Sequence, residues 1–192
     1  ARFITEILPN LMVVDQFPEY SDIPLLVDIY VDPNIIETIR LFNIHKRKMY
    51  FVHTGRPVLC DRLIVVSPPA FAPPEYRVFI EKLEMPKISP ETYKFSKYAI
   101  SLLQARAHDI VPETTSWLGK KIYVQRKVPP YGNARDVINI DNVEEYLRRA
   151  GFCFVEPSSL SPQEQIEAFK DAQVVVAKAG AALANLIYTK AG

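Results

Sequence analysis

The stretch VVVAKAGAALANLIYTKAG, residues 174–192, contains the junction that decides the fold. A run of β-branched residues ends near Ala177, and an alanine-rich stretch of helical character follows from Ala181. Gly180, one of only 6 glycines in the chain, lies between them, and Lys178 lies two residues before it. This order predicts a buried strand that turns directly into a helix.

The same order of strand and helix occurs twice upstream. Residues 120–127 alternate and predict a strand, and the apolar run at 152–157 predicts a second one. Helical patterns at 143–150 and 161–172 separate these strands from each other and from the strand at 173–178. Strands that alternate with helices in this way indicate a parallel sheet flanked by helices. The expected fold class is therefore α/β.

Local signals mark where these two helices begin and end. Asp141 and Glu144 have the spacing of a capping box, and Gly151 follows the first helix as its expected C-terminal stop. Ser161 and Glu164 have the same spacing at the start of the second helix, with proline between them at the first helical position.

The N-terminal part of the chain also mixes helices and strands. Asp32 and Pro33 have the order of a cap and a first helical residue. The expected elements are helices at 2–17 (with Pro9 near a start or kink), 33–43 and 95–111, and strands at 23–31, 49–53 and 61–69. Prolines crowd the connection at 68–93, and we expect a domain boundary at about 112–119, between domains at 1–112 and 119–192.

Composition excludes some classes of protein. The chain has 23 Lys and Arg against 22 Asp and Glu, so a nucleic-acid protein that works by bulk charge is not expected. No apolar run approaches the roughly 20 residues needed to span a bilayer. Cys60 and Cys153 lie beside apolar residues, which favours buried free thiols and a reducing compartment over a disulfide. The expected location is the cytoplasm, free or held at a membrane by other segments.

The turn at Gly180 has two interpretations. In open parallel sheets, ligands bind beyond the carboxyl ends of the strands, next to helix N-termini whose first amides are unpaired. A glycine followed by the small Ala181 and Ala182 would let a phosphate approach those amides. The alternative is that Gly180 only makes a tight turn and the alanines pack the helix on the sheet.

A basic stretch should reach the same edge of the sheet. Arg126 and Lys127 lie at the end of the strand at 120–127, and Arg135 follows in the next loop. Guanidinium groups match phosphate oxygens bidentately, so this loop could complete a diphosphate site. The alternative is a solvated basic loop that is balanced by nearby acidic residues.

Taken together, these motifs resemble glycosyltransferase family 61. That family shows a strand ending in S/Q-R, a loop with R-x-x-x-N, then "LS..EQ…F..A" and "VVGPHGAGLTNLLF". The opening RFITEILPNL also resembles the family's "HFLTEVLPRL", with Glu6 at its acidic position. The positions that match in the C-terminal part are Arg126, Arg135, Asn139, Gln165, Gly180, Ala181 and Asn185.

The resemblance implies a GT-B-like fold of two Rossmann-like domains, incomplete at both ends of this chain. It implies an inverting, metal-independent transferase for a hexose or pentose, with a UDP-sugar as donor substrate, no cofactor and a glycan acceptor, in synthesis of a capsule or another surface polysaccharide. The diphosphate would be bound by Arg126, Lys127, Arg135, Lys178, Gly180, Ala181, Ala182 and Asn185, and Glu6 would be the catalytic base. Edges left open at the chain ends would favour a homo-oligomer.

Two departures from the family pattern leave the activity open. Ala179 stands where the family has the histidine of "GPHG", and Arg2 stands where it has the histidine before F-L-T-E. Neither residue can shuttle a proton near neutral pH. The alternative function is therefore a catalytically inactive nucleotide- or glycan-binding relative. A third is an α/β scaffold with a purely structural Gly180 turn. The three histidines show no metal-ligand spacing, so no metal site is expected.

Overall fold

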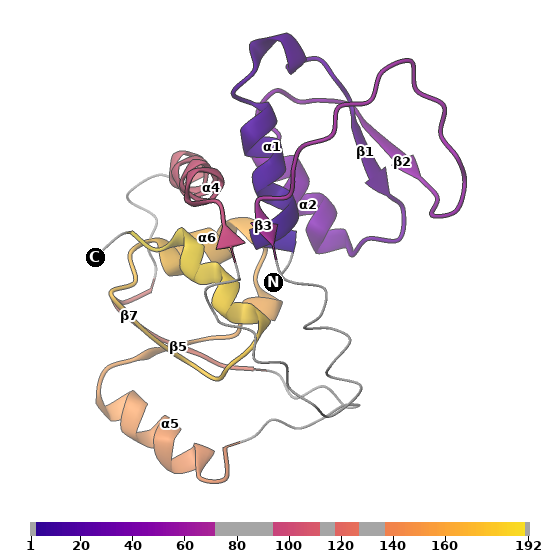
Figure 1. The fold of residues 1–192 in the computed structure, drawn as a ribbon. Helices are drawn as coiled ribbons and strands as arrows, with labels where there is room; N and C mark the ends of the chain where they lie inside the picture. The colour runs from indigo at the N-terminus through magenta and orange to yellow at the C-terminus, as the bar shows by residue number, and fades with distance from the viewer. Residues whose placement is uncertain (1–2, 72–93, 112–117, 127–136, 191–192) are drawn as a thin grey trace.

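The computed structural model of the chain describes residues 3–71, 94–111, 118–126 and 137–190 (Figure 1). It is a mixed α/β structure with two separate parallel sheets and helices around them. One parallel sheet contains β1 and β2, and the other contains β5, β6 and β7. We call them the β1–β2 sheet and the β5 sheet.

The chain begins with a helical segment of two parts. The π-helical turn η1 (Phe3–Ile7) leads directly into α1 (Leu8–Val14), and Pro9 lies in the first turn of α1. This position needs no amide hydrogen bond, so proline is tolerated there. The prediction of a helical start near Pro9 is confirmed, and the short 3-10 helix η2 (Pro18–Tyr20) follows.

The β1–β2 sheet is one strand–helix–strand unit. Strand β1 (Leu25–Asp28) pairs in parallel with β2 (Met49–Val52), and α2 (Pro33–Phe42) connects them. The carboxylate of Asp32 accepts the amide of Asn34 at 2.8 Å and caps α2. Both predicted strands and the predicted cap are therefore confirmed.

The expected strand at 61–69 is wrong. These residues form no strand and pair with none among those the structure describes; residues 62–66 instead line a pocket beside α1. Only the ends of the proline-rich connection are described: β3 (Ala70–Phe71) pairs antiparallel with β4 (Lys94–Phe95). Helix α4 (Lys97–Ile110), capped by Ser96, confirms the helix predicted there.

The β5 sheet repeats the strand–helix order predicted for the C-terminal part. Its strands are β5 (Lys121–Val124), β6 (Cys153–Val155) and β7 (Val174–Ala177), all parallel, in the order β6-β5-β7. Helix α5 (Ile140–Arg149) leads from β5 to β6. The 3-10 turn η5 (Pro157–Ser159) and α6 (Pro162–Lys170) lead from β6 to β7, and η6 (Ala181–Tyr188) follows β7.

One of the two predicted capping boxes is present. In α6, Ser161 and Glu164 exchange hydrogen bonds through their side chains and backbone amides, at 2.7 and 3.3 Å. The capping box at Asp141 is wrong, because α5 begins at Ile140, two residues earlier than a cap at Asp141 requires, and Asp141 falls inside its first turn. Gly151 ends α5 with a positive φ of 77°, as predicted.

A shared core lies between the helices and the β5 sheet. Helix α1 packs against α4, and α2 packs against α6 (Figure 1). The buried residues of this core come from both sides of the expected domain boundary at 112–119. They are Leu8, Leu11, Met12, Phe42, Leu103, Ala107, Val111, Ile122, Val124, Val155, Ile166, Ala168, Phe169 and Tyr188. The division into two Rossmann-like domains of a GT-B fold stays a prediction.

A buried ion network ties three segments of the N-terminal part together. The Asp15 side chain is 1% exposed and pairs with Arg47, whose side chain is fully buried, and with Arg106 of α4 at 3.2 Å. His45 lies 3.8 Å from the same carboxylate. These contacts fix the end of α1 against α4 and against the segment before β2.

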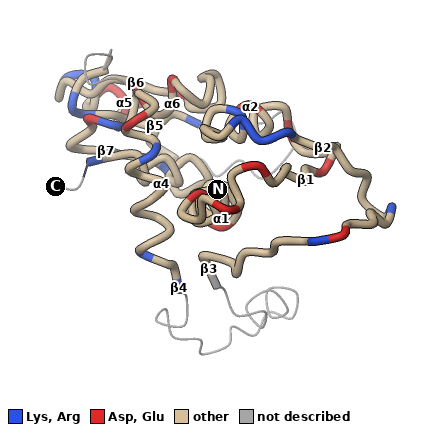
Figure 2. Tube along the Cα trace, turned by 90° about the horizontal axis from the view of Figure 1, so that it is seen from above, with Lys and Arg blue, Asp and Glu red and all other residues tan. Residues whose placement is uncertain are grey.

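The basic residues form no single surface in the described part of the chain. Figure 2 shows Lys and Arg spread over several separate elements.

The cysteines agree only in part with the prediction of buried free thiols. Both are free thiols, but Cys60 is exposed and Cys153 is partly buried.

Candidate functional site

A ligand site is expected at the carboxyl end of β5, the central strand of the β5 sheet. From β5 the chain passes to β6 on one side and then crosses to β7 on the other. The strand order therefore reverses at β5, and in open parallel sheets ligands bind beside the carboxyl ends of the strands at such a switch point. The residues that follow β5 and β7 are the candidates for contact with a ligand.

The structure brings two of the predicted basic residues to this edge. Val124 pairs with Ala177 at the ends of β5 and β7, so Arg126 and the segment Lys178–Gly180 emerge on the same side of the sheet. Arg126 is exposed, while Lys178 is partly buried. We call Arg126 and residues 178–182 the β5–β7 edge. Lys127 and Arg135, predicted for the same site, lie outside the described residues.

Gly180 is not required by the backbone or by packing. Its φ of 169° and ψ of −179° are fully extended, a conformation that any residue adopts. A Cβ built at this position would meet its nearest neighbour, the carbonyl oxygen of Lys178, at 4.0 Å, which is ordinary contact. The interpretation of Gly180 as a residue needed for a tight turn therefore gains no support. The small residue leaves open space at the edge instead.

The predicted helix after Gly180 is a 3-10 helix rather than an α-helix. Its first hydrogen bond joins the amide of Leu183 to the carbonyl of Gly180 at 3.2 Å. The amides of Ala181 and Ala182 precede that bond and point toward the start of the helix. Such amides carry the positive end of a helix dipole, which favours an anion.

Asn185 lies beneath this edge rather than on it. The residue is 3% exposed, and its amide nitrogen donates to Oε1 of Gln165 at 3.1 Å. Gln165 in turn donates to the carbonyl of Leu160 at 3.1 Å. Oδ1 of Asn185 has no hydrogen-bond partner among the described residues. The pair Asn185 and Gln165 thus fixes η6 against α6, two elements that flank the edge.

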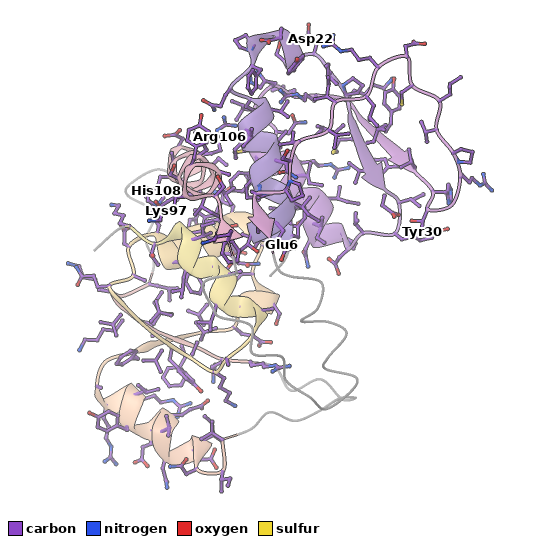
Figure 3. All side chains as sticks on the ribbon, viewed as in Figure 1. Glu6, Asp22, Tyr30, Lys97, Arg106 and His108 are labelled. Atoms are coloured by element: carbon purple, nitrogen blue, oxygen red, sulfur yellow. The ribbon has the colours of Figure 1, made fainter. Side chains whose placement is uncertain are left out.

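Glu6 comes from the other end of the chain. It is partly buried in the π-helical turn η1, and Figure 3 places it at the end of the η1–α1 segment nearest to η6. Ala179, which replaces a family histidine, is exposed at the β5–β7 edge. Arg2, which replaces the other histidine, lies outside the described residues.

A second polar group, which the sequence analysis missed, lies at the carboxyl end of the β1–β2 sheet. Asp28 ends β1, and its carboxylate accepts the Tyr30 amide at 2.8 Å and the Thr54 hydroxyl. The Tyr30 hydroxyl lies 3.2 Å from Nδ1 of His53, the first residue after β2. We call Asp28, Tyr30, Asp32, His53 and Thr54 the β1–β2 edge.

Hydrogen bonds keep the Asp28 carboxylate charged. The Thr54 hydroxyl, followed by the Tyr30 amide, stabilises the charged form and lowers the pKa of Asp28 below its usual value. His53 adds to this lowering through its charge. Only part of this signal was available in the sequence: His53 ends the expected strand at 49–53, but Asp28 lies inside the expected strand at 23–31, which in the structure ends at Asp28.

The described residues also enclose an apolar pocket of about 500 Å³ between α1, β1 and residues 60–66. None of the residues predicted to bind the donor lines it. The walls of the pocket are mainly apolar, and of the two arginines that line it Arg47 pairs with Asp15 and Arg62 lies over the Tyr20 ring. A diphosphate needs cations and amide donors together, and the β5–β7 edge combines them. We therefore place the candidate donor site at the edge.

Metal-binding clusters and membrane-spanning helices are both absent from the part of the chain that the structure describes. Within residues 3–71, 94–111, 118–126 and 137–190, no three or more His, Cys, Asp and Glu side chains are grouped so that they could hold a metal ion. In the same ranges, no helix combines the length and apolar character needed to cross a membrane.

Comparison with known proteins identifies the family. No curated protein and no solved structure matched the chain. The family described as Glycosyltransferase 61 matches residues 2–192, which is nearly the whole sequence. That range includes the β5–β7 edge, the β1–β2 edge and Glu6. The chain therefore belongs to the glycosyltransferase 61 family.

Proposed function

We propose that this chain transfers a sugar from a UDP-sugar to a glycan acceptor and binds the donor diphosphate at the β5–β7 edge. Family membership supports a transferase with a sugar donor and a glycan acceptor. The observation that carries the choice of edge is Gly180. Its backbone is extended and its surroundings are open, so the fold does not require a glycine there. Gly180 and Arg126 follow the paired ends of β7 and β5, at the same edge of the sheet.

In this proposal the edge stabilises the departing diphosphate without a metal. Arg126 would bind two phosphate oxygens in the bidentate way that guanidinium groups allow. Lys178 would add positive charge, Gly180 would leave room, and the amides of Ala181 and Ala182 would donate to the phosphate. Lys127 and Arg135 are proposed for the same site, and Asn185 supports it from below through Gln165.

The proposed chemistry is an inverting transfer. The acceptor hydroxyl attacks the anomeric carbon on the face opposite the diphosphate, so the new C–O bond forms as the bond to the phosphate oxygen breaks. The hydroxyl proton passes to the carboxylate of Glu6, and the released diphosphate keeps the bonding electron pair. We assign this to surface polysaccharide synthesis in the cytoplasm or at its membrane surface, by a chain that can form a homo-oligomer.

The second candidate is a non-catalytic relative that binds the nucleotide or the glycan. Ala179 favours it, because an exposed alanine at the β5–β7 edge cannot move a proton. Release of UDP from UDP-glucose, UDP-galactose or UDP-xylose distinguishes the two candidates. Turnover that is lost in Glu6→Gln, with UDP affinity unchanged, supports the enzyme; UDP binding without any release or transfer supports the inactive relative.

The proposal is tested by calorimetric titration of the full chain with UDP, beside GDP and in the presence of a chelator. We expect UDP to bind selectively and Arg126→Ala to weaken it roughly ten- to hundredfold, the cost of a lost hydrogen bond to a charged group. Arg149→Ala is the matched control, since Arg149 is exposed on α5 and pairs with Glu145. No binding of UDP or of any UDP-sugar, or equal loss in both variants, contradicts the proposal.

A further inference from the structure

The β1–β2 edge holds a set of polar side chains in fixed orientations. The Asp28 carboxylate accepts hydrogen bonds from the Tyr30 amide and the Thr54 hydroxyl, one on each oxygen. These contacts join the loop after β1 to the loop after β2. They hold a charged acceptor group at the carboxyl end of a parallel strand pair, the place where α/β sheets bind ligands.

An aromatic pair lies beside this carboxylate. The rings of Tyr30 and His53 meet edge to face, with centroids 5.7 Å apart and planes at 74°. Nδ1 of His53 is engaged by the Tyr30 hydroxyl, while no hydrogen bond to Nε2 is found in the part of the chain that is described. Tyr30 is 72% exposed, and Figure 3 shows it at the rim of the β1–β2 unit, away from the core.

The charges at this edge disfavour a phosphate. Asp28 and Asp32 are both carboxylates, and Asp32 already occupies the start of α2 by accepting the amide of Asn34. A phosphate would meet both negative charges and would find that helix start capped, although Arg56 lies in the turn that follows His53. A neutral molecule rich in hydroxyl groups meets no such repulsion. It can donate to the Asp28 carboxylate and exchange hydrogen bonds with the imidazole.

We propose that the β1–β2 edge binds a neutral sugar unit of the acceptor glycan. The exposed ring of Tyr30 packs on the sugar ring, and Asp28 and His53 bind its hydroxyl groups. The inference rests on the proposed function, because a glycan acceptor is what a sugar transferase supplies. Figure 3 shows Tyr30 at the outer rim of the β1–β2 unit and Glu6 at the start of the η1–α1 segment, so this site holds the acceptor chain at a unit other than the reacting one.

The first test follows the His53 imidazole and Tyr30 ring by NMR in the full chain. The probes are the neutral methyl β-glycosides of glucose, galactose, mannose and xylose, each added to tens of millimolar, with UDP in a separate titration. We expect at least one glycoside to shift the His53 and Tyr30 signals. If no glycoside shifts them while UDP binds, this inference is overturned and the proposed function stands. If UDP fails to bind, the proposed function fails independently of the glycoside result.

The second test compares two equally exposed tyrosines. Tyr30→Ala should weaken glycoside binding roughly tenfold, as expected for loss of an aromatic contact. Tyr146→Ala is the matched control, because Tyr146 is 71% exposed on α5, away from this edge. Tyr30→Phe should keep the ring contact and therefore most of the glycoside affinity. Equal loss of binding in both alanine variants would overturn the inference.

Discussion

The β1–β2 sheet and the β5 sheet are built by the same strand–helix–strand rule, yet their carboxyl edges differ in charge. The β1–β2 edge carries Asp28 and Asp32 with a histidine and a tyrosine. The β5–β7 edge carries Arg126 and Lys178 and the first amides of η6. Parallel pairing brings loop residues together at both edges, and the residue types in those loops then decide which ligand each edge can bind.

In our proposal, each edge binds one of the two substrates of a single reaction. A diphosphate is an anion, so it suits the edge with cations and free amides. A glycan is neutral and rich in hydroxyl groups, so it suits the edge with a fixed carboxylate and an exposed aromatic ring. Each edge depends on the core that its sheet packs against.

The largest expected effect is on the fold that holds both edges. Asp15→Ala removes the partner of the buried Arg47 and should lower the free energy of unfolding by about 3–5 kcal/mol. Because the core draws on both parts of the chain, thermal denaturation should stay a single transition at a lower temperature. Asp22→Ala, at an exposed position, is the control and should change little. Separate melting of the two parts would show that the edges are not carried by one core.

The next largest expected effect is on UDP affinity, and it tests whether Gly180 makes room for a ligand or meets a requirement of the backbone. Gly180→Ala fits the extended backbone, so the melting temperature should be unchanged or slightly higher. UDP affinity should still fall several-fold, because the methyl group takes the space of a phosphate. Calorimetry measures both quantities.

The matching glycine at the other edge should behave in the opposite way. Gly55, in the turn after β2, has a φ of 82°, which strains any other residue. Gly55→Ala should therefore lower the free energy of unfolding by about 1 kcal/mol and leave UDP affinity unchanged. If Gly180→Ala is the variant that loses stability and keeps UDP affinity, the donor site is not at that glycine.

The smallest effect concerns the charge of the β1–β2 edge. Thr54→Val removes the largest cause of the lowered pKa of Asp28, so that pKa should rise toward its usual value. A lowered carboxyl pKa stabilises the fold above the unfolded-state pKa of about 3.9 and loses that contribution as the pH falls through the folded-state pKa. The variant should thus be slightly less stable above about pH 4, with the difference vanishing at lower pH.

NMR titration of the Asp28 carboxyl carbon in wild type and variant measures this shift. Thr189→Val is the control, because the Thr189 hydroxyl donates to the carbonyl of Leu186 and has no contact with Asp28. An unchanged pKa of Asp28 in Thr54→Val would show that the Thr54 hydroxyl does not hold the carboxylate in its charged form.

Elements with local signals were predicted well. The cap at Asp32, the capping box at Ser161 and the stop at Gly151 each depend on a few neighbouring residues, and all three are present. The alternating pattern that predicted β5 and the β-branched run that predicted β7 were equally clear signals, and both strands are present.

Features that depend on distant partners were not predictable in the same way. The apolar run at 61–69 has the composition of a strand, but its apolar residues 63–66 line the pocket beside α1 and join no sheet that the structure describes. The 3-10 form of η6 is another feature that the alanine-rich sequence did not predict. The link between Tyr30 and His53 joins residues 23 positions apart and exists only through the parallel register.

The assignment of the donor to the β5–β7 edge is tested most directly by mapping UDP on the backbone amide signals of the full chain. The account predicts that the largest chemical-shift changes fall on Arg126 and on Gly180, Ala181 and Ala182, with the residues of the β1–β2 edge nearly unmoved. Changes centred on Asp28 and His53, or on the apolar pocket beside α1, would contradict it.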